Sequence, residues 1–278
     1  MKKAEIGISL NHSYALPTKE VIRLVSKIGF NAVSIEWKED VNLKELCSLA
    51  RENGLYVQSF HGPYRGAADM WSNNETAVNK AKEQLISCIK DCKENSVPVM
   101  VIHCWIGFDY TDTPTKEGLK NYGEIIALAE KCGVKVALEN TEGTEFLGAL
   151  LDNFKSEYVG FCYDSGHELC YSPMENLTEK FGDRLLMCHL NDNLSISDKN
   201  GKISDYDDLH LLPFDGIADW DNIVKGLKKS KSLPFLNFEV KINNKFGRKE
   251  CEAYAAITIE EYFTECYKRA LIIAEKYF

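Results

Sequence analysis

The sequence has no long apolar run, and we expect no export signal. Of its 278 residues 45% are hydrophobic, but no stretch approaches the roughly 20 consecutive apolar residues that a membrane-spanning helix needs. The first residues, MKKAEIGISLNHS, contain too short an apolar stretch for a signal peptide. We therefore predict a cytoplasmic protein without a membrane partner.

The chain has fewer basic than acidic residues: 33 Lys and Arg against 42 Asp and Glu, which gives a net charge of -9. This balance disfavours nonspecific binding to nucleic acid. Low-complexity blocks and like-charge runs are absent, and the 7 prolines and 18 glycines are scattered. An α/β barrel reaches this length without a linker, so we expect one domain over residues 1–278.

The 10 cysteines are spread along the chain, unlike those of a small disulfide-rich protein. Without an export signal, reduced thiols are expected. Cys104 follows His103 and Cys188 precedes His189. On a strand these neighbours point to opposite faces, which predicts that both cysteines face a helix layer.

Apolar strands and amphipathic helices alternate along the chain, a pattern typical of a parallel sheet covered by helices. Strands are expected at residues 4–10, 32–36, 55–61, 99–103, 134–139, 159–164, a segment ending at 189, and 235–239. Helices are expected from near 18, at 42–53, 74–94, 115–132 and 144–153, and from 258, where Thr258 and Glu261 have capping-box spacing. The fold class is therefore α/β, a single (β/α)8 TIM barrel.

Nearly every expected strand ends on a carboxylate or an imidazole. These residues are Glu36, His61, His103, Glu139, Asp164, His189 and Glu239. His167 is expected in the loop after one strand, and Asp208 and His210 alternate as on an extended segment within a long connection, 190–218. Any one of these residues alone would more often be a satisfied core group. Together they predict a metal site at the carboxyl end of the strands.

The motifs at these strand ends resemble those of the xylose isomerase-like TIM barrels, which include D-tagatose 3-epimerase, inosose isomerase and endonuclease IV. The motifs are SFHGPY, VIHCW, VALEN, YDSGH, CHLNDN, DLHLLPFDG and NFEVK. In the epimerase branch the resemblance implies one metal ion, with His167 touching the substrate. Its ligands would be Glu139, Asp164, His189 and Glu239. In the endonuclease branch further residues complete a site for three zinc ions. These are His61, His103, His167, Asp208 and His210.

The four epimerase-type ligands suit Mn²⁺, Zn²⁺, Co²⁺ or Mg²⁺ with positions left for substrate oxygens. Such an ion polarises a sugar carbonyl and makes the neighbouring C–H more acidic. Glu139 and Glu239 are then the candidate acid and base, and His167 is either an oxyanion donor or a ligand. Whether Asp208 and His210 bind metal or only order their loop stays open.

Four residues are expected to bind substrate: His61, His103, Trp105 and Lys241. In the one-metal interpretation the two histidines line the pocket. Trp105 is one of several aromatic residues near strand ends, with Tyr64 and Phe108, whose flat faces suit a sugar's C–H surface. Lys241 lies two residues beyond Glu239 and therefore on the same side of an extended segment. It could meet a phosphate or a hydroxyl.

We predict a divalent-metal-dependent isomerase or epimerase that acts through an enediolate on a small carbohydrate or sugar phosphate. The oligomeric state is left open, with a homo-oligomer among the alternatives. One alternative function is an endonuclease IV-like multi-zinc phosphodiester hydrolase of abasic DNA. The complete ligand set supports it, whereas the acidic charge and the lack of clustered Lys and Arg oppose it. The remaining alternatives are other metal-dependent sugar chemistry and a noncatalytic sugar-binding barrel.

Overall fold

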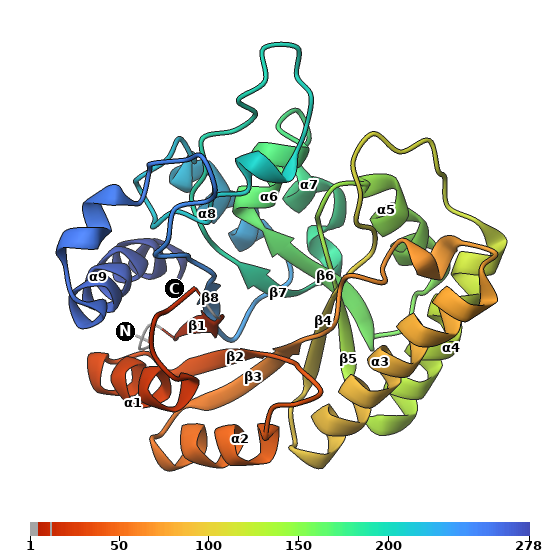
Figure 1. Cartoon of the computed structure of the whole chain (residues 1–278), viewed down its shortest axis with the longest axis horizontal. Helices are drawn as coiled ribbons and strands as arrows, with labels where there is room; N and C mark the ends of the chain where they lie inside the picture. The colour runs from red at the N-terminus through yellow and green to blue at the C-terminus, as the bar shows by residue number, and fades with distance from the viewer. Residues whose placement is uncertain (1–4, 12) are drawn as a thin grey trace.

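A computed structural model describes residues 5–11 and 13–278 and shows eight parallel strands surrounded by helices (Figure 1). The strands are β1 (Ile6–Leu10), β2 (Ala32–Glu36), β3 (Tyr56–His61), β4 (Val99–His103), β5 (Lys135–Glu139), β6 (Val159–Asp164), β7 (Leu185–His189) and β8 (Leu236–Phe238). Of the 6 histidines in the chain, His12 lies outside the described residues. The expected (β/α)8 TIM barrel is confirmed.

The strands pair in the order β7-β6-β5-β4-β3-β2-β1-β8. A parallel bridge between Leu190 and Phe238 brings the two edge strands together. The amide of Leu190 donates to the carbonyl of Asn237, and the amide of Glu239 donates to the carbonyl of Leu190. The barrel is therefore nearly closed, and the carboxyl ends of all eight strands meet at one end.

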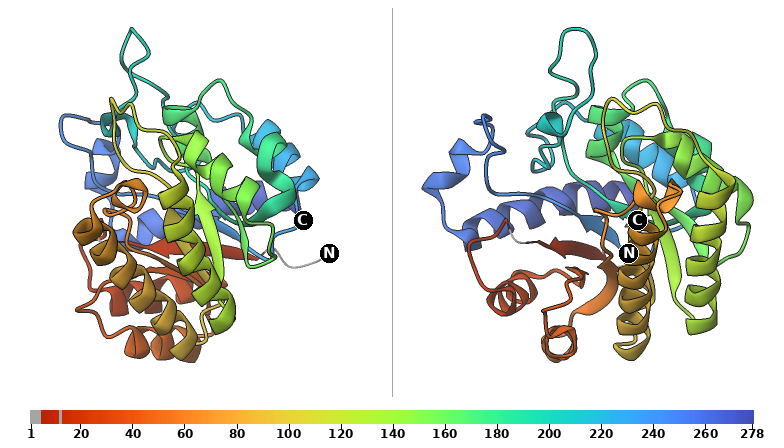
Figure 2. Two further views of the ribbon diagram at one scale, coloured as in Figure 1. Left: turned by 90° about the vertical axis from the view of Figure 1, so that its right-hand side faces the viewer. Right: turned by 45° about the vertical axis from the view of Figure 1, so that its right-hand side comes forward.

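Helices cover the outside of the barrel, as the views of Figures 1 and 2 show. They are α1 (Thr18–Ile28), α2 (Leu43–Glu52), α3 (Glu75–Glu94), α4 (Lys116–Cys132), α5 (Thr144–Asn153), α6 (Ser165–Tyr171), α7 (Leu177–Phe181), α8 (Trp220–Lys229) and α9 (Ile259–Tyr277). Short 3₁₀ turns are η1 (Asp69–Trp71), η2 (Gly182–Arg184), η3 (Asp205–Asp207) and η4 (Glu252–Ala256). None of the helices in the described residues is long and apolar enough to cross a membrane.

Local sequence explains where many helices begin. Before α2, α3, α4, α8 and α9 a polar side chain accepts a hydrogen bond from a first-turn amide. These N-cap residues are Asn42, Asn74, Thr115, Asp219 and Thr258. The predicted capping box of Thr258 and Glu261 is present. Gly133 ends α4 with a φ of 72°, a left-handed conformation that glycine adopts without a Cβ penalty.

Three local predictions were wrong. His167 lies in α6 rather than in a loop, because Asp164 accepts the His167 amide and starts a helix directly after β6. β8 ends at Phe238, so Glu239 follows the strand although its amide still bonds to Leu190. The segment with Asp208 and His210 is not extended, since His210 has a φ of 51°.

The inside of the barrel has an apolar half and a polar half. On the side of β4 to β7 the interior is filled by a separate cluster of buried side chains, which consists of Val101, Ala137, Cys162 and Met187. Under β8, β1, β2 and β3 the buried side chains are polar, namely Asn237, Ser9, Ser34 and Ser59. Each of β2 to β7, and the end of β8, presents a carboxylate or imidazole two residues beyond an interior residue. Because side chains at positions i and i+2 of a strand point to the same face, these carboxylates and imidazoles form one layer at the carboxyl end of the barrel interior.

All ten cysteines are free. Cys104 and Cys188 are 1% and 0% exposed and belong to the core between strands and helices. The predicted direction of these two side chains is therefore confirmed.

Arg184 generates a prediction about stability, because its guanidinium donates to three backbone carbonyls. The acceptors are Leu151, Phe154 and Val159, at 3.0, 2.8 and 2.8 Å. Arg184→Ala leaves these carbonyls without their charged donor, so we expect unfolding to require about 2–4 kcal/mol less free energy in urea denaturation. Arg184→Lys, which keeps the charge but not the fork of donors, should lose less. An alanine variant within about 0.5 kcal/mol of wild type would contradict this role.

Candidate metal centre

A cavity of about 510 Å³ opens at the carboxyl ends of the strands. We call it the strand-end cavity. Its ionisable lining includes Glu36, His61, His103, Glu139, Glu142, His167, Asp208, His210, Glu239, Lys241 and Lys245. Asp164 and His189 are both 0% exposed. The loop after β7, drawn in teal, projects beyond this end of the barrel in Figures 1 and 2.

The four residues expected as ligands of one ion lie together. Each offers one potential ligand atom, and these atoms lie within 4.8 Å of one another. We call Glu139, Asp164, His189 and Glu239 the four-residue group. At its centre, Nδ1 of His189 lies 2.9 Å from Oε1 of Glu139 and 2.6 Å from Oε2 of Glu239. The two glutamates therefore approach one imidazole from β5 and from the end of β8.

Backbone and amide contacts orient Asp164. Its Oδ1 accepts the amide of His167 at 2.7 Å, and both its carboxylate oxygens accept from Nδ2 of Asn191. The Asn140 side chain meanwhile bonds the backbone of Asp164 on both sides, at 2.8 and 2.7 Å. A Cβ at Gly166 would collide with Oδ1 of Asn191, so only glycine lets α6 pass this close. These contacts hold the carboxylate in one orientation.

Neither Asn140 nor Asn191 was predicted from the sequence, although a signal was present. Each lies one or two residues after a strand-end ligand, in the motifs VALEN and CHLNDN. Asp192, also missed, is 0% exposed and accepts from the amides of Phe214 and Ala218 and from the Trp220 indole. It thereby folds the long connection after β7 back toward the barrel.

Two further ligand groups flank the first. His61 and His103 converge on Oε2 of Glu139, at 3.2 and 3.5 Å. On the other side, Nε2 of His210 and of His167 lie 2.9 and 3.4 Å from Oδ1 of Asp208. The ligand atoms of each trio lie within 4.8 Å of one another. The structure therefore brings together all nine residues that the two branches of the family would use.

Three of the histidines are oriented by backbone carbonyls. Nδ1 lies 3.0 Å from Gly62 O in His61, 2.9 Å from Asn140 O in His167, and 3.0 Å from Glu239 O in His210. A carbonyl only accepts, so Nδ1 carries a proton and Nε2 faces a carboxylate in the cavity. Metal-binding histidines in proteins typically have this arrangement.

In the four-residue group burial and neighbouring charges oppose each other. At Asp164 burial prevails and raises the pKa. Burial would raise the pKa of Glu139, but the charge of His189 and the imidazoles of His103 and His61 hold that pKa well below its usual range. Burial is likewise outweighed at Glu239, whose pKa is lowered chiefly by His189. Burial would lower the pKa of His189, yet the surrounding acidic groups raise it well above its ordinary value.

The flanking group behaves in the same way. Burial would raise the pKa of Asp208, but His210 and Lys241 hold it well below its ordinary value. Burial would lower the pKa of His167, yet the carboxylates of Asp164 and Asp208 raise it to about 10. Imidazolium charges thus compensate the carboxylates, and a divalent cation could replace those protons.

The residues fit a metal ion on a further observation. Oε2 of Glu139, Oε2 of Glu239 and Oδ1 of Asp208 are buried and have no hydrogen bond to the described residues. Each lies close to an imidazole nitrogen, but not in hydrogen-bond geometry. Buried carboxylate oxygens without a donor are costly, and coordination of a cation would satisfy them.

The sequence profile of the Xylose isomerase-like TIM barrel family matches residues 22–257. The chain belongs to this family. It is 30% identical over 244 residues to Uncharacterized protein y4fM of Sinorhizobium fredii, a match that covers 82% of this chain and 73% of that protein. The family predicted from the strand-end motifs is confirmed.

Solved structures share the fold at low identity. The IOLI protein, whose structure has a bound zinc atom, has a TM-score of 0.78 and 17% identity, covering 98% of this chain and 99% of that chain. D-allulose 3-epimerase from Methylomonas sp., in complex with D-allulose, has a TM-score of 0.73 and 15% identity, covering 100% and 98%. These likenesses establish the xylose isomerase-like barrel architecture.

Within this barrel the aromatic residues divide into two sets. Tyr64 and Phe108 line the strand-end cavity. Trp105, expected to bind substrate, is 4% exposed and not part of the cavity lining. Its ring stacks on Phe146 with centroids 4.2 Å apart, because its side chain points into the helix layer. Tyr171 lines the cavity and was not predicted.

Cation binding by the four-residue group should release protons. The imidazoles compensate the carboxylates while protonated, whereas a metal ligand must be neutral, so affinity should rise with pH. We expect Mn²⁺ to bind the metal-free protein more tightly at pH 8 than at pH 6. Calorimetry in buffers of different ionisation enthalpy should show release of about one proton or more per ion.

Two glutamine variants serve as controls for this titration. Glu239→Gln removes a ligand and should abolish tight binding. Glu142→Gln should not, because Glu142 lines the cavity and accepts the Gly107 amide but belongs to none of the ligand groups. Binding that is independent of pH, or unchanged in Glu239→Gln, would show that the cation binds elsewhere.

Proposed function

We propose that the protein is a divalent-metal-dependent isomerase or epimerase of a small carbohydrate. One observation carries the proposal: three carboxylates and an imidazole converge, and two of these carboxylates, Glu139 and Glu239, line a cavity of about 510 Å³. A cavity of this size suits a small molecule. Family membership and the sugar epimerases that share the fold support it.

The four-residue group would hold the ion. When bound there, a divalent ion would polarise a sugar carbonyl and make the adjacent C–H more acidic. The ligand set of three oxygens and one nitrogen suits Mn²⁺, Zn²⁺, Co²⁺ or Mg²⁺.

Glu139 and Glu239 are the groups proposed to move the proton. They come from β5 and β8, which are not neighbours in the barrel, and both reach His189. Two carboxylates that approach from different directions can serve the two faces of one carbon, so that one removes the proton and the other returns it. An enediolate forms in between, and the return on the opposite face gives the epimer.

Other cavity residues would bind the substrate and stabilise charge. His167 presents Nε2 to the cavity and could donate a hydrogen bond to the enediolate oxygen. His61 and His103 could bind hydroxyl groups. Tyr64, whose ring stacks on His103 with centroids 4.9 Å apart, offers a flat surface for the sugar's C–H face.

Deuterium incorporation tests this mechanism directly. In D₂O a substrate should take up deuterium at the carbon next to the carbonyl, because the proton removed exchanges with solvent. A panel of ketohexoses, pentuloses and inososes, with Mn²⁺, Co²⁺, Mg²⁺ or Zn²⁺, can be followed by NMR. Glu139→Gln and Glu239→Gln should each slow exchange by about 10²–10⁴-fold.

Metal content must be measured beside exchange, because both glutamates are proposed ligands. The informative variant is one that keeps its ion and loses exchange. Glu142→Gln, which leaves the ligand groups intact, should exchange at nearly the wild-type rate. Wild-type protein loaded with metal that exchanges no carbon proton on any sugar would refute the enediolate route.

A specific observation favours a second candidate, a multi-metal phosphodiester hydrolase. Glu139 belongs both to the four-residue group and to the trio with His61 and His103. Together with the trio of His167, Asp208 and His210, these groups could hold more than one ion. Several adjacent ions stabilise both the attacking and the leaving oxygen of a phosphodiester. The net charge of -9 opposes nucleic acid as the preferred partner.

The double variant Asp208→Ala/His210→Ala separates the two candidates. An isomerase needs only the four-residue group, so we expect the variant to retain one ion and proton exchange, with any loss confined to substrate affinity. Metal analysis and the exchange assay check this. Efficient nicking of an abasic-site duplex by wild type, abolished in the variant along with part of its metal, would favour the hydrolase instead.

A further inference from the structure

Two lysines lie on one wall of the strand-end cavity. Lys241 and Lys245 follow β8, and both line the cavity beside Asp208. Lys241 was expected there from the sequence, whereas Lys245 was not. Glu139 and Glu239 of the four-residue group line the same cavity, and the two lysines add positive charge to its lining.

Few carboxylates lie close to the ammonium groups of the two lysines. Nζ of Lys241 and of Lys245 lie 3.4 and 3.8 Å from Oδ2 of Asp208. The other oxygen of the same carboxylate already faces His210 and His167. The second carboxylate near Lys245 is Asp205, at 3.8 Å, whose side chain is 75% exposed and therefore screened by solvent. One carboxylate, whose side chain is 14% exposed, is thus shared by two ammonium groups and two imidazoles.

Both ammonium groups also retain unused donors. Within the described residues, Lys241 makes one side-chain hydrogen bond, to Oδ2 of Asp208, and Lys245 makes one, to the carbonyl of Asp208. Both are 3.4 Å long, beyond the usual range for N–H···O bonds. An ammonium has three donors, so each can take further acceptors from a ligand.

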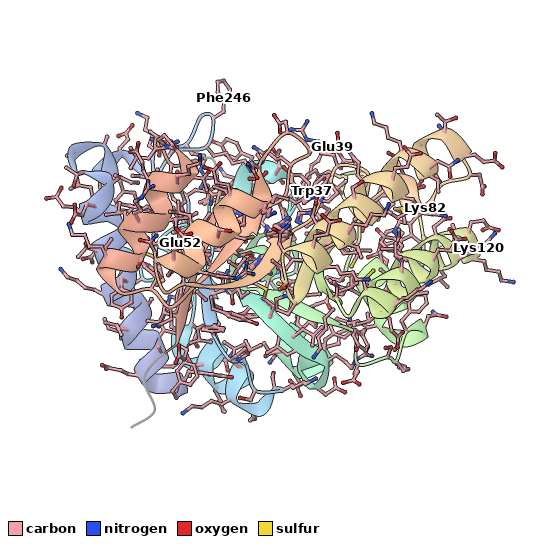
Figure 3. The ribbon with its side chains drawn as sticks, turned by 90° about the horizontal axis from the view of Figure 1, so that it is seen from below. Trp37, Glu39, Glu52, Lys82, Lys120 and Phe246 are labelled. Carbon is pink, nitrogen blue, oxygen red and sulfur yellow. The ribbon has the colours of Figure 1, made fainter. Side chains whose placement is uncertain are left out.

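The surrounding loop is held in place. The amide of Lys241 donates to the carbonyl of His210. Arg248, whose side chain is 8% exposed, pairs with Asp207 at 3.0 Å and with Glu250 at 2.8 Å. These contacts tie the loop after β8 to the loop after β7. Figure 3 shows the tip of the loop after β8 at Phe246, which is 97% exposed, extending away from the barrel.

We propose that the substrate is an anionic sugar, whose terminal phosphate or carboxylate binds between Lys241 and Lys245 while its carbonyl end lies over the four-residue group. This inference rests on the proposed function and names the substrate class within it. Phosphate and carboxylate oxygens are acceptors that an ammonium binds with charge-assisted hydrogen bonds.

Calorimetric titration of the Mn²⁺-loaded protein with matched ligands tests the inference. Each ketose of the exchange panel is compared with its terminal phosphate and its uronate, so that the source of the negative charge is distinguished. We expect an anionic member to bind at least about 10-fold more tightly than the neutral one. Lys241→Met and Lys245→Met should each weaken that binding by about 10- to 100-fold and reduce the preference for the anionic ligand over the neutral one.

Lys249→Met is the matched control, since Lys249 lies on the same loop, is exposed and does not line the cavity. It should bind all ligands as wild type does. Having two lysine variants guards against misfolding of one, which melting curves reveal. Neutral sugars that exchange protons and bind as well as their anionic counterparts, unaffected by either substitution, would overturn this inference and leave the proposed function intact. No binding of any sugar would overturn both.

Discussion

The structure depends on a carboxylate buried at the centre of a barrel. Glu139 is 1% exposed and has four imidazoles around it, those of His61, His103, His167 and His189, at 2.9 to 3.5 Å. An isolated carboxylate in such a place would cost many kcal/mol, so it needs positive charge close by. The raised pKa values of His167 and His189 favour the charged imidazolium form beside Glu139, and the same geometry suits a cation. The imidazoles from the other strands and from α6 therefore surround Glu139.

Meeting that requirement needs more than the ligands themselves. Asn140, Asn191 and the start of α6 hold Asp164, and backbone carbonyls hold the Nδ1 atoms of three histidines. Asp192 and Arg248 order the two loops that complete the cavity. Each outer contact restricts the orientation of a potential ligand, so the geometry of the group is set by the chain itself. The left-handed backbone of His210, with a φ of 51°, is a local strain maintained by this network.

Much of the fold could be predicted because the strands end where their polar residues begin. Apolar runs bounded by turn residues located β2 and β4 to the residue, and capping residues located α9. The errors arose where tertiary contacts override local pattern. The motif YDSGH contains a glycine and a serine and reads as a loop, yet Asp164 caps a helix there. The role of Trp105 in substrate binding stays a prediction, but its ring stacks on Phe146 and does not line the cavity.

Residue chemistry and period-two alternation are local properties, and they sufficed to predict the barrel and a metal site at its strand ends. The resemblance of the strand-end motifs then implied the family and the nine potential ligands. The distances between those ligands are not local. They follow from closure of the barrel by Leu190 and Phe238, which brings Glu239 next to His189 although the two residues are 50 positions apart. Likewise, only folding of the loops after β7 and β8 brings Lys245 next to Asp208, since spacing along an irregular loop carries no direction for its side chains.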